Sequence, residues 1–307
     1  MDINICYSSD NNYIKYLGVS IKSLVENAKL ENNYYIYILE DNINDVNKQR
    51  LQNLQTENCF IRFVNVNKLI SKYQINNLHL SGHLTLSTYL RLLIPNVFTG
   101  LEKVIYLDCD TIINNDIALL YQQNIDNSYL GCIKDQGLLY QGAKNKIDKK
   151  YFERVLNLSK YTNYFNAGVI LYNLAKIRNN KSDIFEVVKQ IKKPKFHDQC
   201  YLNAFAKEHV TYLPFEWNFF GLFKYENPKY ALDFPKEYRE EFENAAKSPS
   251  IIHGKLWEYP DSEYSDIFFH YARMTSFYES IIYENASKKR KKKVIKFCGI
   301  KIKYKSR

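Results

Sequence analysis

Few of the features that mark specialised protein classes occur in this sequence. Glycine and proline are scarce, with 10 and 7 residues among 307, and the chain has no repeat and no segment rich in either residue. A collagen-like chain and a flexible interdomain linker are therefore excluded. No stretch approaches the roughly 20 apolar residues that a membrane-spanning helix needs, and the first apolar run is too short for a signal peptide. These absences favour one soluble or peripheral domain.

Zinc-binding and disulfide patterns are also missing. The six cysteines form no C-x-x-C pair, and the histidines do not complete a zinc-binding pattern around them. Cys6, Cys59 and Cys132 lie in or beside apolar strands. This is typical of reduced core residues, and we therefore expect a cytoplasmic protein.

No glycine-rich phosphate loop follows the first predicted strand. Residues 8–12 read Ser-Ser-Asp-Asn-Asn at that place, where a dehydrogenase needs G-x-G-x-x-G. A sugar-1-phosphate nucleotidyltransferase also normally carries a glycine-rich loop there. The absence excludes the dehydrogenase and counts against the nucleotidyltransferase.

The residues that are present have a globular composition and an uneven distribution of charge. The hydrophobic share of 46% and the charged share of 25% exclude intrinsic disorder. The formal net charge is +10, but residues 287–307 hold eleven Lys and Arg and no acid, so residues 1–286 are nearly neutral. Because nucleic-acid-binding domains usually spread such residues over a folded face, we expect no nucleic acid partner. A basic tail instead favours an electrostatic anchor.

Apolar runs alternate with helical patterns along the first third of the chain. This alternation predicts an α/β fold with a doubly wound parallel sheet. The expected strands are 3–7, 34–39, 59–64, 104–107, 129–133, 169–173 and 251–252. The expected helices are one around 17–25, then 44–54, 88–93, 174–191, 199–207, 235–246 and 267–285. In such folds the ligand lies at the carboxyl ends of the strands.

Two carboxylates stand directly after the predicted strand 104–107. Asp108 and Asp110 are separated by one residue, and both can turn toward one hard cation where the chain leaves the pleat. Carboxylate oxygens suit Mg²⁺ or Mn²⁺, and such an ion is how proteins usually hold a diphosphate. The alternative is a solvated loop or an Asp paired with a Lys.

Two further segments carry polar groups next to predicted elements. Asn166 and Ala167 precede Gly168 at the start of a strand, where the backbone can approach a ligand and the amide can bind a hydroxyl. A plain turn is the alternative. Asp198 and Gln199 stand where a helix begins, so Asp198 is either an N-cap or part of a pocket.

The last segment of this kind follows the short strand 251–252. His253 can complete a metal site, Gly254 allows a close approach to phosphate, and Lys255 can neutralise its charge. The alternative is a structural histidine.

Together and in this order, these segments resemble glycosyltransferase family 8, which contains bacterial lipopolysaccharide galactosyl- and glucosyltransferases and glycogenin. The resemblance covers roughly residues 2–260. It implies three metal ligands, Asp108, Asp110 and His253. It implies donor-binding residues Ser8, Asp10, Asn12, Arg91, Asp108, Asn166, Ala167, Asp198, Gln199, Gly254 and Lys255. In the family the final motif contains spacers and a Pro before the Trp, whereas here it is compressed to residues 253–257 without the Pro.

The resemblance also implies an activity. It implies a single-domain GT-A fold, a UDP-galactose or UDP-glucose donor, Mn²⁺ or Mg²⁺, and retention of the anomeric configuration. The acceptor would be a glycan or glycolipid, as in lipopolysaccharide or other cell-surface polysaccharide synthesis. Asp198 would fix the donor sugar, and Gln199 would stabilise developing positive charge through its carbonyl dipole.

The chain is accordingly divided into a catalytic domain (1–260), a helical C-terminal extension (261–286) and a basic tail (287–307). Six consecutive cations at 288–293 precede apolar residues interleaved with Lys, a pattern suited to an anionic membrane surface. We expect the protein at the inner face of the cytoplasmic membrane, bound through residues 288–307. For the tail, the alternative is a disordered solubilising segment. For the function of the protein, the alternatives are a sugar-1-phosphate nucleotidyltransferase-like enzyme and a non-catalytic membrane- or nucleic-acid-binding protein on the same fold.

Overall fold

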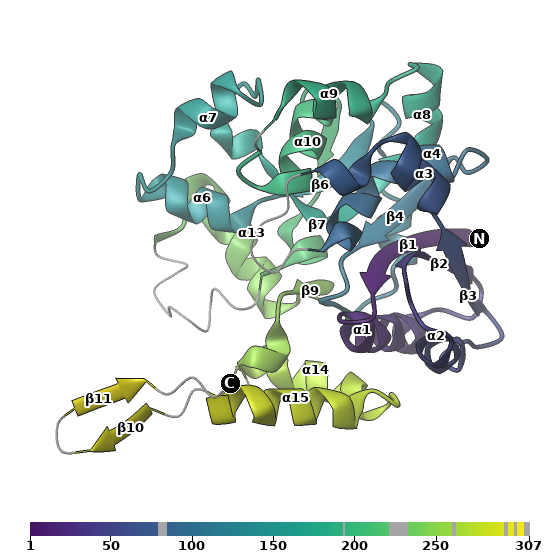
Figure 1. Ribbon diagram of the computed structural model, residues 1–307. Coiled ribbons are helices and arrows are strands. Elements are labelled where there is room, and N and C mark those ends of the chain that lie inside the picture. Colours follow the sequence, from purple (N-terminus) through teal and green to yellow (C-terminus); the bar gives the residue numbers. More distant parts are fainter. Residues whose placement is uncertain are drawn as a thin grey trace.

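The protein is built around a seven-stranded sheet with helices on both faces (Figure 1). The computed structural model describes residues 1–78, 85–192, 194–220, 233–259, 262–291, 294–297 and 300–303, and it describes no side chain at 263 or 288–303. The sheet contains β1 (Asp2–Asp10), β2 (Asn33–Asp41), β3 (Cys59–Asn65), β4 (Lys103–Leu107), β6 (Leu130–Lys134), β7 (Phe165–Asn173) and β8 (Val210–Tyr212), in the order β3-β2-β1-β4-β7-β6-β8. The α/β fold class predicted from the sequence is confirmed.

One strand departs from the expected parallel sheet. Strands β3, β2, β1 and β4 are parallel, whereas β7 is antiparallel to both β4 and β6. The connection from β6 to β7 closes at one end of the sheet, where the Asp135 N–H donates to the Tyr164 carbonyl at 3.0 Å. The first residues of β7 therefore reach the edge at which β4 ends.

Two apolar cores lie on opposite faces of the sheet. Side chains of β1 alternate between them, as the period of a strand requires: Ile3, Ile5 and Tyr7 belong to one core and Cys6 to the other. Helices α1 (Ile14–Asn27), α2 (Asp45–Gln52), α5 (Ala118–Tyr121), α13 (Lys236–Lys247) and α14 (Glu263–Arg273) border the first core. The second core is bordered by α3 (Asn67–Lys72), η2 (Leu86–Leu93), α4 (Ile94–Val97), α7 (Lys149–Arg154), α8 (Leu174–Asn179), α9 (Ile184–Gln190) and α10 (His197–Ala206).

Three of the expected helices differ from those observed. The segment 174–191 forms two helices, α8 and α9, because Lys181 takes a left-handed φ of 50° and Asp183 caps the second helix by accepting from the Phe185 N–H. The segment 267–285 is likewise divided between α14 and α15 (Tyr278–Lys291), and 88–93 is part of the 3₁₀ helix η2. The other helices within the described residues are α6 (Gln136–Ala143), η1 (Ile75–Asn77), η3 (Tyr161–Asn163), η4 (Phe215–Asn218) and η5 (Leu256–Glu258).

A second, two-stranded sheet brings distant parts of the chain together. Strand β5 (Thr111–Ile113) follows the Asp pair, and it pairs antiparallel with β9 (Ile251–His253), so that Thr111 stands opposite His253. This pairing brings His253 to the Asp pair that follows β4.

The described parts of the C-terminal segment are a helix and two paired strands. Helix α15 ends at Lys291, and β10 (Val294–Phe297) pairs antiparallel with β11 (Ile300–Lys303). The side chains of the proposed anchor, 288–307, lie outside the described residues. Within the described parts of the chain, the helices are too short or too polar to cross a membrane.

Candidate active site

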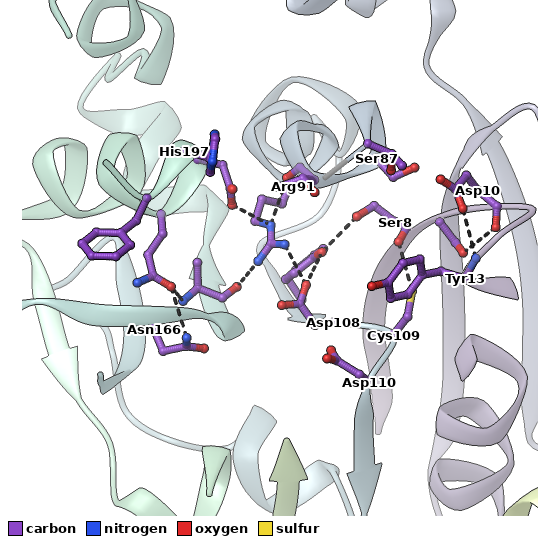
Figure 2. A pocket seen from close by; sticks show the side chains of 18 of the residues that line it. Ser8, Asp10, Tyr13, Ser87, Arg91, Asp108, Cys109, Asp110, Asn166 and His197 are labelled. Atoms are coloured by element: carbon purple, nitrogen blue, oxygen red, sulfur yellow. Dashed lines mark hydrogen bonds and ion pairs between the residues drawn. The ribbon is translucent and has the colours of Figure 1, made fainter. Parts of the chain in front are cut away.

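A cavity of about 600 Å³ opens where β1 and β4 end and β7 begins (Figure 2). Parallel strands present their carboxyl ends at one edge, and α/β proteins bind their ligands there. Many of the predicted site residues line this cavity: Ser8, Asp10, Arg91, Asp108, Asp110, Asn166, Ala167, Asp198, Gln199 and Lys255. The tertiary structure thus brings together residues from six separate segments of the sequence.

Arg91 connects the two sides of the cavity wall (Figure 2). Its Nη2 lies 2.7 Å from Asp108 Oδ1, its Nε lies 3.0 Å from Asp198 Oδ2, and its Nη1 donates to the Ala167 carbonyl. The guanidinium also stacks over the Tyr106 ring, 4.6 Å from its centroid. Because a planar guanidinium offers donors in fixed directions, it holds both carboxylates in place.

Asp198 lies in the first turn of α10 and is buried. The alternative interpretation as an N-cap is wrong, because Phe196 occupies the cap position and the Asp198 carboxylate pairs with Arg91. Burial raises the pKa of Asp198 to about 6, although the Arg91 guanidinium acts in the opposite direction. The carboxyl group is therefore closer to its protonation midpoint at neutral pH than an exposed Asp.

Three groups able to bind a metal converge at one side of the cavity. One side-chain atom from each of Asp108, Asp110 and His253 lies within 4.8 Å of the others. His253 Nε2 is 3.2 Å from Asp110 Oδ1 and 3.7 Å from Asp108 Oδ2. Burial opposes the charged form of each partner, yet their mutual attraction raises the pKa of His253 and lowers the pKa of Asp110.

The backbone of β7 leaves space for this cluster only because residue 168 is glycine. A Cβ at Gly168 would lie 2.1 Å from His253 Cε1 and 2.9 Å from Asp108 Oδ2. The Gly168 carbonyl also accepts the Asp108 N–H at 2.8 Å. Two carboxylates and an imidazole form a donor set that fits Mn²⁺, and with water ligands also Mg²⁺.

The last residues of β1 and the turn that follows them line one end of the cavity. The Ser8 and Tyr106 hydroxyls are 2.9 Å apart, and Tyr106 donates to Asp108 Oδ1 at 2.9 Å. Asp10 Oδ1 accepts the N–H groups of Asn12 and Tyr13 at 2.8 and 3.0 Å, just before α1. The side chain of Asn12 is exposed, and Asn12 is not among the described residues that line the cavity.

Hydrogen-bonded amide side chains line the cavity beside β7. Gln199 Oε1 accepts from Asn166 Nδ2 at 3.1 Å and from the Ala167 N–H at 2.9 Å, and Gln199 Nε2 donates to Asp135 Oδ2 at 3.0 Å. Asp135 also accepts the Leu138 N–H and so caps α6. The interpretation of the segment at Asn166 and Ala167 as a plain turn is wrong, because Phe165–Asn173 is one strand whose first residues line the cavity.

The compressed C-terminal motif reaches the cavity in part. Lys255 lines it, and Gly254 turns the chain with a φ of 135° while its N–H donates to the Asp110 carbonyl at 3.0 Å. Gly254 itself is not among the described lining residues. Trp257 stacks on Tyr16 at a centroid distance of 3.6 Å, which anchors this segment on α1.

Several residues that contact the site are not among the residues predicted for it, including Asp135, Gly168 and Asn218. Asp135 follows directly after a strand, as Asp108 does, and that position could have revealed it. Gly168 stands in a segment already singled out, but its contact with His253 depends on the β5–β9 pairing. Asn218, whose Oδ1 lies 2.8 Å from His253 Nδ1, carries no signal in the sequence.

Three proteins of known sequence are similar to this chain. A putative glycosyltransferase of Haemophilus influenzae is 34% identical over 223 residues, which cover 71% of this chain and 63% of that protein. General stress protein A of Bacillus subtilis is 26% identical over 288 residues, covering 89% of this chain and 94% of that protein. A lipopolysaccharide 1,2-glucosyltransferase of Escherichia coli K12 is 25% identical, with 70% of this chain matching 62% of that protein.

Solved structures share the fold. The apo structure of the bifunctional glycosyltransferase WbbM matches with a TM-score of 0.81 and 27% identity, over 92% of this chain and 51% of that chain. The galactosyltransferase LgtC, in complex with donor and acceptor sugar analogues, matches with a TM-score of 0.68 and 24% identity, over 90% of this chain and 96% of that chain. The sequence model described as glycosyl transferase family 8 matches residues 4–258. The chain is therefore a GT-A protein that belongs to glycosyltransferase family 8.

Proposed function

We propose that this protein is a retaining hexosyltransferase that moves galactose or glucose from a UDP-sugar to a glycan or glycolipid acceptor. The product would belong to lipopolysaccharide or another cell-surface polysaccharide. The observation that carries the proposal is the Asp108–Asp110–His253 cluster beside a cavity of about 600 Å³. Both hexoses are included because the similar proteins comprise a lipopolysaccharide 1,2-glucosyltransferase and a galactosyltransferase.

Asp108, Asp110 and His253 would hold Mn²⁺, or Mg²⁺ with more water ligands. A bound divalent cation supplies Lewis-acid stabilisation of the diphosphate leaving group. Lys255 lines the same cavity and carries a second positive charge for the phosphates. At the other end, Ser8 and Asp10, in the last residues of β1, would receive the nucleoside.

The donor sugar would be positioned by the groups on the opposite wall. Asp198 is fixed by Arg91 and would accept hydrogen bonds from sugar hydroxyls, which is a positioning role. Asn166 and the Ala167 backbone would border the same sugar. Two hydrogen bonds hold Gln199 Oε1 in place, so that its dipole is oriented before the reaction begins.

Retention of configuration allows either double displacement or attack on the same face. Double displacement requires a strong nucleophile beside the anomeric carbon. Gln199 is an amide, and its oxygen already accepts two hydrogen bonds, which lowers its nucleophilicity further. Same-face attack, in which the acceptor hydroxyl gives its proton to the departing phosphate oxygen, is therefore the route that we favour.

A donor panel tests this function. Full-length protein is incubated with UDP-, GDP- and CMP-sugars, with and without Mn²⁺, and the released nucleotide is quantified. We expect Mn²⁺-dependent release of UDP from one sugar. Asp110→Ala should lower the rate about 10²–10³-fold, because the metal loses a ligand. Asp126→Ala, at an exposed loop position, should match the wild type; equal rates in both variants would contradict the metal site.

We also propose that the protein is cytoplasmic and binds the anionic inner face of the cytoplasmic membrane through residues 288–307. Support comes from the sequence, which has eleven cations and no acid there. Each cation near an anionic surface contributes about 1 kcal/mol. An acceptor linked to lipid would then be held near the active site.

Truncation tests the anchor. A chain ending at Asn285 keeps the hydrogen bond from Asn285 Nδ2 to the Trp257 carbonyl, so the catalytic domain should remain folded. We expect the full chain to sediment with vesicles containing anionic lipid and the truncated chain to stay in the supernatant. Equal sedimentation of both chains would show that the tail is not the anchor.

A further inference from the structure

Asn218 is a fully buried polar side chain beside the metal-ligand cluster. It ends η4, and its Oδ1 lies 2.8 Å from His253 Nδ1, while its Nδ2 donates to Asn166 Oδ1 at 2.9 Å. Its own backbone carbonyl accepts from Gln136 Nε2 at 2.8 Å. A buried amide is costly unless its hydrogen bonds are satisfied, and here both ends of the amide have partners.

Two backbone N–H groups determine which way the neighbouring amides point. The Gly168 N–H donates to Asn166 Oδ1 at 2.8 Å, and the Ala167 N–H donates to Gln199 Oε1 at 2.9 Å. A backbone nitrogen can only donate, so both side chains must present oxygen to it. Asn166 Nδ2 then faces Gln199 Oε1, as observed at 3.1 Å. Both backbone donors therefore require the same orientation.

The orientation of the Asn166 amide determines that of the Asn218 amide, which in turn determines which His253 nitrogen carries hydrogen. Because Asn166 presents oxygen, Asn218 must present its NH₂ group to it, and Asn218 Oδ1 is left facing His253. An amide oxygen only accepts, so His253 Nδ1 carries a hydrogen. The lone pair available to a cation is then on Nε2, the ring atom that lies beside Asp110 and Asp108.

We propose that Asn218 is a positioning residue that holds the His253 ring with Nε2 toward the cation and links this ligand to the donor-sugar side of the cavity. The inference rests on the proposed function and adds to it a residue outside the cavity lining. The link consists of Asn218, Asn166 and Gln199, and it ends at the Asp135 carboxylate. One continuous series of hydrogen bonds would thus connect the histidine that binds the cation with the residues that bind the sugar.

Metal affinity tests the proposal without relying on activity. Titration calorimetry would measure Mn²⁺ binding to the full-length protein in the presence of UDP. Asn218→Leu removes both side-chain hydrogen bonds and should weaken Mn²⁺ binding about 10–100-fold. Asn218→Asp keeps an acceptor for His253 and should bind within about threefold of the wild type, but it loses the donor to Asn166 and should lower kcat for UDP-sugar hydrolysis.

Asn58→Leu is the matched control. Asn58 is also a buried amide, and its Nδ2 donates to the Lys29 and Asn32 carbonyls on another part of the molecule. If Asn218→Leu binds Mn²⁺ as tightly as Asn58→Leu and the wild type, Asn218 has no positioning role. If the wild type and Asp110→Ala both fail to bind Mn²⁺, the proposed metal site itself is wrong. The two results distinguish a failure of the Asn218 proposal from a failure of the proposed function.

A measurement on the unmodified side chain covers the case in which Asn218→Leu does not fold. Nitrogen-15 NMR of the histidine rings, with Mg²⁺ and UDP bound, reports which ring nitrogen carries hydrogen. The His253 signal is assigned by its loss in His253→Gln. We expect a protonated Nδ1 and an unprotonated Nε2; the reverse tautomer would overturn the proposal.

Discussion

Replacing Gly168 with alanine is expected to abolish metal-dependent release of UDP while most of the chain stays folded. The added Cβ would lie 2.1 Å from His253 Cε1, 2.8 Å from His253 Nδ1 and 2.9 Å from Asp108 Oδ2. Two of the three proposed metal ligands must therefore move. A displacement of about 1 Å at a reacting centre can lower the rate about 10²-fold, and we expect at least this loss.

The control for this substitution is Gly100→Ala, because a Cβ at Gly100 meets no atom within 4 Å. Mn²⁺ affinity by calorimetry and UDP release should be unchanged in Gly100→Ala and strongly reduced in Gly168→Ala. Circular dichroism of both variants would show whether the sheet persists. If Gly168→Ala keeps the Mn²⁺ affinity and hydrolysis rate of the wild type, His253 and Asp108 do not form the metal site in the geometry described.

Replacing Arg91 with leucine is expected to give the largest loss of stability among substitutions in the cavity wall. Arg91 is buried and pairs with Asp108 and Asp198. Removing one partner of a buried ion pair typically costs about 3–5 kcal/mol, because the remaining charge is left without compensation. Urea unfolding, followed by fluorescence, would measure this change in the free energy of unfolding.

The loss should depend on pH. In the wild type, burial already raises the pKa of Asp198 to about 6 against the effect of Arg91, and without Arg91 it should rise further. A carboxyl group whose pKa is raised by folding takes up a proton on folding, so its contribution to stability falls as the pH increases. Arg91→Leu should therefore be more destabilised at pH 8 than at pH 5.

Arg178→Leu is the matched control for Arg91→Leu. Arg178 Nη1 donates to the backbone carbonyls of Phe98 and Leu101, so its removal leaves neutral acceptors. We expect a loss of about 1–2 kcal/mol with little dependence on pH. If Arg91→Leu behaves like this control at both pH values, the Asp108 and Asp198 carboxylates do not depend on Arg91.

The elements that could be predicted from the sequence were those with a local cause. The strand 104–107 is predictable because a short apolar run there meets two carboxylates, and β4 does end at Leu107, directly before Asp108. Helix 235–246 was close to the observed α13, Lys236–Lys247. The break between α8 and α9 was missed, because it depends on a left-handed Lys181 and a capping Asp183 inside a mostly helical pattern.

The candidate site shows the same division. Individual motifs were visible in the sequence, but each had a structural alternative, since a helix-capping Asp and a site Asp look alike before their partners are known. The contact between Asp198 and Arg91 removed that ambiguity. Asn218 had no local signal, because its importance comes only from the side chains around it.

The sequence by itself determined the alternation of strands and helices, the carboxylate pair at the end of a strand, and the concentration of positive charge after residue 286. These features depend on residues that are neighbours along the chain. Only the tertiary structure decided that β7 runs antiparallel, which brings Asn166 and Gly168 to the edge where β4 ends, and that β9 pairs with β5, which brings His253 to Asp110. Strand pairing between distant segments depends on the shared core and on backbone hydrogen bonds. Neither can be recognised from the residues that are neighbours along the chain.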